Sequence, residues 1–230
     1  MHSRNDLVSL ALLAISFLPL CPANAQDKAS VLAELDAAAK GFRTTSATVE
    51  LDTIQTDPVY DKDVMTGTAY YERKDGHFKM AAHITGHMVG KQSRPMEKTY
   101  IFSGGTLRYS DTGKEKDAKP YTEASKYESY LLLGFGASGE ELEKKWNITY
   151  LGKDKDVTTE SGAPTDKLEL IAKDPKVLKL FPKVTVWMDT ARAVSLKQIF
   201  DEGEGQSRIC TYTNIKVNQP LPKNAFSFDK

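Results

Sequence analysis

Cysteine is scarce in this chain of 230 residues, which contains only Cys21 and Cys210. Cys21 lies in an apolar N-terminal stretch that we expect to be removed, so that Cys210 remains as a single thiol. A single cysteine forms no internal disulfide. We therefore expect a fold that is stabilised by packing rather than by covalent cross-links.

An excess of charge of one sign is also missing, since 31 Lys and Arg residues balance 31 Asp and Glu residues. A protein that binds nucleic acid presents a basic face, and electrostatic adsorption to anionic lipid requires clustered Lys and Arg. The neutral balance argues against nucleic acid as a partner and against simple adsorption to a charged membrane.

Long hydrophobic runs are missing except at the N-terminus, where Leu7–Leu20 is mainly apolar. This run follows a weakly basic start and precedes Ala23-Asn24-Ala25, a small-x-small pattern. The order is typical of a secretory signal peptide that is cleaved after Ala25, and the run is short for crossing a bilayer. We predict that residues 1–25 are a cleaved signal peptide and that residues 26–230 form a single exported domain.

The N-terminal stretch has two alternative interpretations. One is a retained membrane anchor, which its length and flanks disfavour. The other is a lipid anchor on Cys21, but such a site has a small residue directly before the cysteine, and Leu20 stands there. We prefer cleavage after Ala25.

Recognisable catalytic motifs are missing as well. The sequence contains no Gly-x-Ser-x-Gly elbow, no phosphate-binding loop and no dinucleotide fingerprint. His83 and His87 are four residues apart, but they lack the glutamate of a zinc-protease motif, and a zinc site needs three or four ligands. Glu140-Glu141 fits the solvated face of a polar helix. We expect a non-enzymatic protein with no catalytic residues, no metal and no cofactor.

The most informative stretch that is present runs from Gly67 to Met80 and predicts two strands around an Asp-Gly turn. Side chains alternate between the faces of a strand. Tyr71 and Arg73 therefore share one face, and Phe78 and Met80 continue an apolar row after the turn. If this face lines a cavity, Arg73 is a cation at the rim of an apolar surface, where it is costly without partners.

The rest of the chain predicts many strands and a few helices. Helices are expected at 27–40, 125–136, 139–145 and 175–180. Strands are expected at 44–55, 64–73, 77–85, 97–103, 106–110, 146–151, 156–160, 167–172, 183–189, 193–201, 206–217 and 226–228. A polar loop is expected to end at Pro95. In the long strand 206–217, one face is expected to carry Ile209, Thr211, Thr213, Ile215 and Val217.

Antiparallel strands in this number avoid bare edges by curling toward a barrel. We predict a mainly β fold with α: an unclosed antiparallel β-barrel, or half-barrel, with an N-terminal helix and an internal helical lid over its concave face. The lid is expected at 125–136, where an apolar run is flanked by glycines. Ligand pockets are lined mainly by apolar and aromatic side chains. The candidate cavity residues are Arg73, Tyr71, Phe78, Met80, Phe102, Tyr109, Leu131, Leu132, Leu133 and Phe135, with ordinary core packing as the alternative for each.

The order of these segments resembles a known family. The segments that carry the resemblance are Phe42-Arg-Thr-Thr-Ser-Ala-Thr-Val49, Gly67-x-x-x-Tyr71-Glu-Arg73, Tyr100-Ile-Phe-Ser-Gly-Gly-Thr-Leu-Arg-Tyr109 and Asn224-Ala-Phe-Ser-Phe228. In order and spacing they resemble the outer-membrane lipoprotein carrier family, LolA, over nearly all of residues 26–230.

This resemblance implies an unclosed β-barrel whose cavity accepts the acyl chains of lipoproteins. It implies a periplasmic carrier that takes acylated lipoproteins, or lipid, from an inner-membrane release transporter to an outer-membrane receptor, and we expect a monomer. The family's lid-latching arginine matches Arg73, although Lys74 stands where the family has proline. The alternative is an envelope lipid-binding or sensor protein that uses the same fold for another lipid or for a protein partner.

Overall fold

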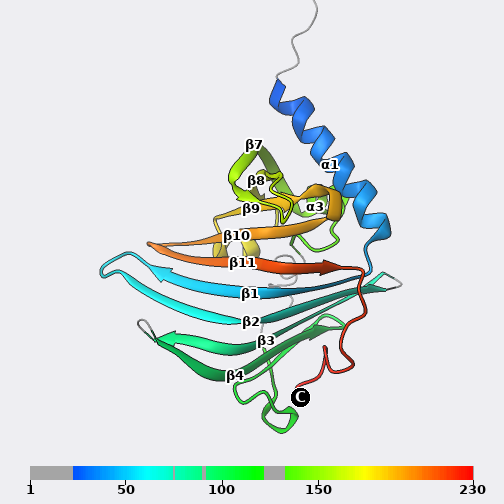
Figure 1. Ribbon diagram of the computed structural model, residues 1–230. Coiled ribbons are helices and arrows are strands. Elements are labelled where there is room, and N and C mark those ends of the chain that lie inside the picture. The colour runs from blue at the N-terminus through cyan, green and yellow to red at the C-terminus, as the bar shows by residue number, and fades with distance from the viewer. Residues whose placement is uncertain (1–22, 75, 90–91, 122–132, 230) are drawn as a thin grey trace, which may run out of the picture.

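The computed structural model describes residues 23–74, 76–89, 92–121 and 133–229 (Figure 1). Its main element is one sheet of eleven strands that pair antiparallel with their neighbours. The strands are β1 (Thr44–Gln55), β2 (Asp61–Lys74), β3 (His77–Val89), β4 (Gln92–Ser103), β5 (Thr106–Ser110), β6 (Lys119–Pro120), β7 (Trp146–Thr158), β8 (Pro164–Ala172), β9 (Lys183–Asp189), β10 (Val194–Gly203) and β11 (Gln206–Val217). The helices are α1 (Ala23–Gly41), α3 (Gly139–Lys145) and α4 (Pro175–Leu180), with short 3-10 helices η1 (Glu115–Asp117) and η2 (Thr190–Arg192).

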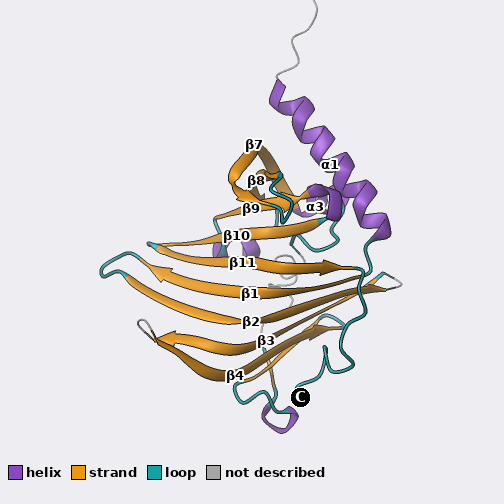
Figure 2. Cartoon of the chain, in the orientation of Figure 1, coloured by secondary structure: helices purple, strands orange, loops and turns teal. Residues whose placement is uncertain are grey.

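The strands lie in the order β6-β5-β4-β3-β2-β1-β11-β10-β9-β8-β7. The sheet curves strongly, and β7 and β8 bend over at one end, near α1 and α3 (Figure 2). Within the described residues, the edge strands β6 and β7 do not pair with each other, so the sheet stays open. The predicted mainly β fold, an unclosed antiparallel barrel with an N-terminal helix, is confirmed. The predicted lid falls largely on 122–132, outside the described residues.

The hairpin that the sequence predicts around Gly76 is formed by β2 and β3. Gly76 has a φ of 74°, a conformation that glycine adopts without steric cost. The register pairs Tyr71 with Met80 and Arg73 with Phe78. Directly paired residues point to the same side of a sheet, so these four side chains share one face, as predicted.

The predicted loop that ends at Pro95 is wrong, because β3 continues to Val89 and β4 begins at Gln92. The register of β2 and β3 shifts at Gly67, which marks a bulge. A Cβ atom at Gly67 would lie 2.1 Å from the carbonyl oxygen of His83, so only glycine fits. The extra residue at the bulge is Thr85 in β3, opposite Gly67. This bulge and the polar residues between it and Pro95 interrupt the alternation of apolar and polar side chains, which is why the sequence predicted a loop.

Two further expectations about strands are corrected. The predicted strands at 146–151 and 156–160 are joined in one continuous strand, β7, which ends at Thr158 and whose pairing with β8 is irregular on either side of Asp154. Residues 226–228 form no strand. Instead, Phe228 is buried against Ala81 and Ile101, and the C-terminal segment covers the outer face of the sheet.

The predicted helix at 125–136 is contradicted over the part that the structure describes. Residues 133–136 contain a turn and an isolated bridge that pairs Phe135 with Val194. Gly136 has a φ of 68°, which is incompatible with a right-handed helix. This segment therefore lies against β10 as a turn followed by a bridge, not as a helix.

The alternation of β11 changes phase, which contradicts the single face predicted for it. Tyr212 and Ile215 are both buried although they are three residues apart. Asn214, between them, has a φ of 51°, and the register of β11 with β1 shifts beside it. Cys210 and Tyr212 therefore face inward before Asn214, and Ile215 faces inward after it.

Helix α1 packs against α3, β7 and η2. Val31, Leu32 and Leu35 are buried between residues 27 and 41 of this helix, and Leu35 is completely buried. They belong to a core cluster with β8 and β9, while a second cluster extends over β1 to β4 and β11. The helix includes the expected cleavage position after Ala25, and that cleavage stays a prediction. Within the described residues, no helix is both long and apolar enough to pass through a bilayer.

Candidate functional site

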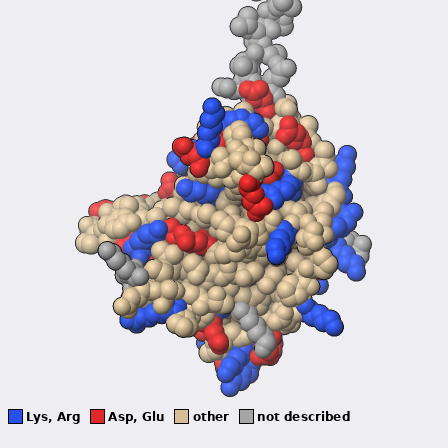
Figure 3. Space-filling view, viewed as in Figure 1, with Lys and Arg blue, Asp and Glu red and all other residues tan. Residues whose placement is uncertain are grey.

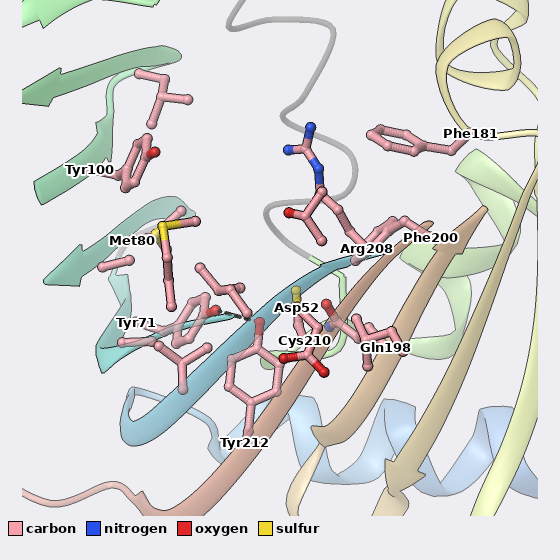
Figure 4. A pocket seen from close by; sticks show the side chains of 18 of the residues that line it. Asp52, Tyr71, Met80, Tyr100, Phe181, Gln198, Phe200, Arg208, Cys210 and Tyr212 are labelled. Carbon is pink, nitrogen blue, oxygen red and sulfur yellow. Dashed lines mark hydrogen bonds between the residues drawn. The ribbon is translucent and has the colours of Figure 1, made fainter. Parts of the chain in front are cut away.

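A cavity of about 210 Å³ lies inside the curved sheet, against the second core cluster (Figure 4). Residues from seven strands, β1 to β5, β10 and β11, contribute to it, together with Phe181 after α4 and Tyr121 after β6. The residues that line it are Val49, Leu51, Asp52, Thr53, Met65, Ala69, Tyr71, Met80, Ala82, Tyr100, Leu107, Tyr121, Phe181, Gln198, Phe200, Arg208, Ile209, Cys210 and Tyr212. Most of these side chains are apolar or aromatic, as in pockets for apolar ligands.

The strand register explains how residues far apart in sequence meet at the wall of this cavity. Gln198 pairs with Cys210, Cys210 pairs with Leu51, and Leu51 pairs with Met65. This row crosses four neighbouring strands on one face of the sheet. Gln198 is almost fully buried, and its Nε2 donates a hydrogen bond of 2.6 Å to the Leu133 carbonyl oxygen. The row thus joins the wall to the 133–136 segment.

The predicted cavity residues divide into three groups in the structure. Tyr71 and Met80 line the cavity. Arg73, Phe78, Phe102, Tyr109, Leu133 and Phe135 are not among the residues that line it. Leu131 and Leu132 lie outside the described residues. The site residues therefore remain a proposal, which the structure centres on Tyr71 and Met80.

The residues behind the wall support those that line it. Phe135 is completely buried and its ring stacks on Tyr71, with centroids 3.8 Å apart and planes 6° apart. It also meets the edge of Tyr212 at 4.8 Å. Phe78 lies 6.0 Å from the Tyr71 ring and 6.4 Å from Phe102. These rings fix the orientation of Tyr71 and Tyr212 at the wall.

Sequence reasoning did not include Cys210, Gln198 or Arg208 among the candidate residues. For Cys210 and Arg208, the cause is the phase change of β11: the sequence groups the residues of one face from Ile209 onward, whereas the structure turns the even-numbered residues before Asn214 inward. The alternation of Arg208, Cys210 and Tyr212 was a signal that could have found this face.

The hydroxyl and thiol groups of Tyr71, Tyr212 and Cys210 at the cavity wall are uncharged near pH 7. The Tyr71 hydroxyl donates to the Tyr212 hydroxyl oxygen at 3.4 Å. Burial raises the pKa of both phenols well above the usual value. Burial also raises the pKa of the Cys210 thiol to about 12, despite a hydrogen bond with Tyr212 that lowers it. This part of the wall, along β2 and β11, therefore presents neutral polar groups to the cavity.

Arg73 lies away from this cavity and pairs with helix α3. Its Nη1 is 2.9 Å from Glu141 Oε1, and it borders a separate small cavity of about 100 Å³. Its Nε is buried and has no hydrogen-bond partner among the described residues. Ser138 caps the helix by accepting a hydrogen bond from the Glu141 backbone N–H. The ion pair therefore connects β2 to the start of α3.

The Glu141 carboxylate is held in its ionised form by these contacts. Burial alone would raise the pKa of this carboxyl group, but hydrogen bonds from Arg73 and from the Ser138 backbone N–H outweigh it, and the pKa lies below the ordinary 4.5. A lowered pKa in the folded state means that the ionised group stabilises the fold above pH 4.5. That contribution is lost as the pH falls through the folded-state pKa.

We expect Glu141→Gln to have a lower melting temperature than the wild type at pH 7, and the difference to shrink as the pH falls below 4.5. The reason is that acid protonates the wild-type carboxyl group as well. Thermal unfolding followed by circular dichroism at a series of pH values measures this. Glu140→Gln is the control, since among the described residues the exposed Glu140 side chain forms an ion pair with the exposed Lys144. A difference that stays constant across the pH range would contradict the expectation.

The fold and the cavity together define an open half-barrel with an apolar interior. Within the described residues, no group of three or more His, Cys, Asp or Glu side chains is placed to hold a metal ion. His87 contacts Asp63, and His83 is buried with its Nε2 2.8 Å from the Ala225 carbonyl oxygen. The two histidines thus have separate partners.

Comparison with known proteins gives structural neighbours only. No family model matches the sequence, and no curated protein matches it. A DUF1329 family protein from Desulfovibrio piger is similar at 10% identity and a TM-score of 0.46, covering 88% of this chain and 97% of its own. A candidate outer membrane lipoprotein-sorting protein domain from Vibrio parahaemolyticus is similar at 16% identity and a TM-score of 0.46, covering 89% and 97%. A LolA superfamily protein from Nitrosomonas europaea is similar at 13% identity and a TM-score of 0.40, covering 87% and 97%.

Proposed function

We propose that this protein binds an acyl chain in the cavity of the half-barrel and acts as a periplasmic carrier of lipoproteins between the inner and outer membranes. The observation that carries the proposal is the apolar cavity, whose wall is built from seven strands by side chains such as Leu51, Met65, Met80 and Phe200. The lipoprotein cargo and the route between the two membranes come from the sequence resemblance to LolA.

The physical need for such a carrier follows from the cost of exposing an acyl chain to water. Each methylene group that leaves an apolar environment costs about 0.8 kcal/mol. One long acyl chain therefore meets a barrier on the order of 10 kcal/mol when it leaves a bilayer. A carrier lowers this barrier to the extent that it offers apolar surface to the chain, and the cavity wall supplies part of that surface.

The size of the cavity adds a requirement to this proposal. Its volume of about 210 Å³ is below the range of about 300–1,000 Å³ for typical ligand pockets. A long acyl chain therefore needs the cavity to widen. The proposal includes that widening as a step of cargo binding.

The surface charge suits a carrier that passes between membranes without being held by either. Lys and Arg side chains are mixed with Asp and Glu over the face that Figure 3 shows. Anionic lipid attracts surfaces on which basic residues are clustered. A mixed surface leaves binding at each membrane to specific partners, for which the proposal names an inner-membrane release transporter and an outer-membrane receptor.

The direct test is native mass spectrometry of the protein purified gently from its own cell envelope. The expected result is a population with added mass that fragments to an acylated lipoprotein. Added mass from a lipid without a protein part would favour the alternative function, that of an envelope lipid-binding or sensor protein. Protein that is always free of acylated species would contradict acyl-chain binding.

Cys210 provides a second test, because this thiol lies in the cavity wall. Burial raises its pKa to about 12, so very little reactive thiolate is present at pH 8. In a Cys21→Ser variant, we expect slow alkylation of the folded protein by a thiol reagent and fast alkylation after unfolding. Addition of an acyl ligand should slow alkylation of the folded protein further. Mass spectrometry of the labelled chain measures both rates. An alkylation rate of the folded protein that the acyl ligand leaves unchanged would contradict binding at this wall.

A further inference from the structure

Arg208 on β11 is the charged side chain that faces the cavity. It pairs with Phe200 on β10 and with Thr53 on β1, so these three side chains share one face. Figure 4 shows its guanidinium reaching into the space between Tyr100 and Phe181. Asp52 also borders the cavity, but the alternation of β1 turns its side chain to the outer face.

The outward direction of Asp52 is supported by its partner. Its Oδ2 is 2.7 Å from Lys62 Nζ. Lys62 pairs with Ile54 in the register of β1 and β2, and Ile54 lies on the same side of β1 as Asp52. The cavity-lining residues within the described chain therefore direct one ionised group inward, the guanidinium of Arg208.

An ion pair engages only part of this guanidinium. Its Nε is 2.8 Å from Glu202 Oε1, and the Arg208 side chain is 54% exposed while that of Glu202 is 16% exposed. The two Nη groups have no hydrogen-bond partner among the residues that the structure describes. A guanidinium carries five N–H donors and binds a carboxylate or phosphate through two of them at once. One donor edge is thus open to a second anion.

The polarity of the cavity wall decreases along the strands, starting from the row of paired residues that contains Arg208. The row at Arg208 carries the charge. The next row, Cys210 with Leu51 and Met65, is neutral, and farther along the strands the wall consists of Ala82 and Met80. A site that is cationic at one end and apolar at the other matches a ligand with an anionic head and a hydrocarbon tail.

We propose that Arg208 binds the anionic head, a carboxylate or a phosphate, of a single-chain amphiphile whose tail lies in the cavity. The proposal rests on the acyl-chain binding proposed above and adds the chemistry of the head and the direction of the tail. Because Glu202 already balances the charge of Arg208, the head gains mainly from hydrogen bonds to the Nη groups. The expected preference is about tenfold, close to the contribution of one charge-assisted hydrogen bond.

The experiment compares ligands that share one tail and differ in the head. Dodecanoate, dodecyl phosphate and dodecanol are titrated by calorimetry into the wild type, into Arg208→Gln and into Lys216→Gln. Lys216 is an exposed cation on the same strand, which makes it the matched control. Acetate and inorganic phosphate, which have no tail, are tested as competitors, and thermal unfolding confirms that each variant is folded.

The wild type should bind both anionic amphiphiles about tenfold more tightly than dodecanol. Arg208→Gln should lose this preference and keep its affinity for dodecanol, while Lys216→Gln behaves as the wild type. Acetate and phosphate should not compete, which identifies the head of an amphiphile rather than a free anion as the ligand.

Four results would overturn the proposal. Equal binding of all three amphiphiles by the wild type would contradict a site for the anionic head. An unchanged preference for the anionic amphiphiles in Arg208→Gln would show that Arg208 does not form that site. In both cases, binding of dodecanol would still support the proposed function. An equal loss for all three ligands in Arg208→Gln means that Arg208 and Glu202 only support the wall. Failure of every amphiphile to bind contradicts the proposed function itself.

Discussion

Replacing Ala82 by tryptophan is expected to abolish most acyl-chain binding while the protein stays folded. Ala82 lines the cavity and is only partly buried. It lies between Ala69 and Tyr100 in the sheet register, so an indole at this position projects into the space that the chain would occupy. Each methylene group that is excluded loses about 0.8 kcal/mol, so the exclusion of three lowers the affinity roughly 50-fold. Competition against a fluorescent acyl probe measures the loss.

The control for this variant is Thr85→Trp, a change on the same strand at an exposed position. It adds the same side chain without entering the cavity and should bind the probe as the wild type does. Overpacking costs about 1–3 kcal/mol in a filled core, and the empty volume beside Ala82 should keep the cost of Ala82→Trp at the low end. Wild-type affinity in Ala82→Trp would place the acyl chain somewhere other than this cavity.

Phe135→Ala is expected to destabilise the protein more than any other single change considered for this site. Phe135 is completely buried, and its ring contacts both Tyr71 and Tyr212. Truncation of a buried phenylalanine costs about 3–5 kcal/mol. For a chain of this size, that corresponds to a fall in melting temperature of roughly 6–20 °C. Calorimetric or circular-dichroism unfolding at neutral pH measures the shift.

Tyr60→Ala serves as the control for Phe135→Ala, because Tyr60 is 64% exposed. Exposed substitutions of this kind change stability by within about 0.5 kcal/mol. A Phe135→Ala variant that unfolds at the same temperature as Tyr60→Ala would show that the stack on Tyr71 contributes little. In that event, the support that we describe for the cavity wall would be wrong.

Local sequence signals predicted those elements whose ends carry strong turn or capping residues. The bounds of β1, β5, α3, β9 and β11 agree with the predicted 44–55, 106–110, 139–145, 183–189 and 206–217. The turn between β4 and β5 contains Gly104 and Gly105, both at positive φ. Ser138 and Glu141 form a capping box at α3. In these places, the residue types that end an element act within a few positions of its end.

The inner wall was harder to predict, because it depends on register between distant strands. Tyr71 and Met80 were identified from a hairpin, in which neighbouring residues in sequence pair in space. Cys210 meets Leu51 only through the pairing of β11 with β1. The positive φ of Asn214 also changes the phase of β11, and an asparagine in a strand gives only a weak sign of such a conformation. Long-range pairing and one backbone irregularity thus decided which residues line the cavity.

The pairing of β1 with β11 has a consequence for how the molecule is made. Thr48 lies beside Thr213, although almost the whole domain separates them in sequence. The centre of the sheet therefore cannot form until the C-terminal strand has left the ribosome, and contacts of such long separation are typical of slowly folding proteins.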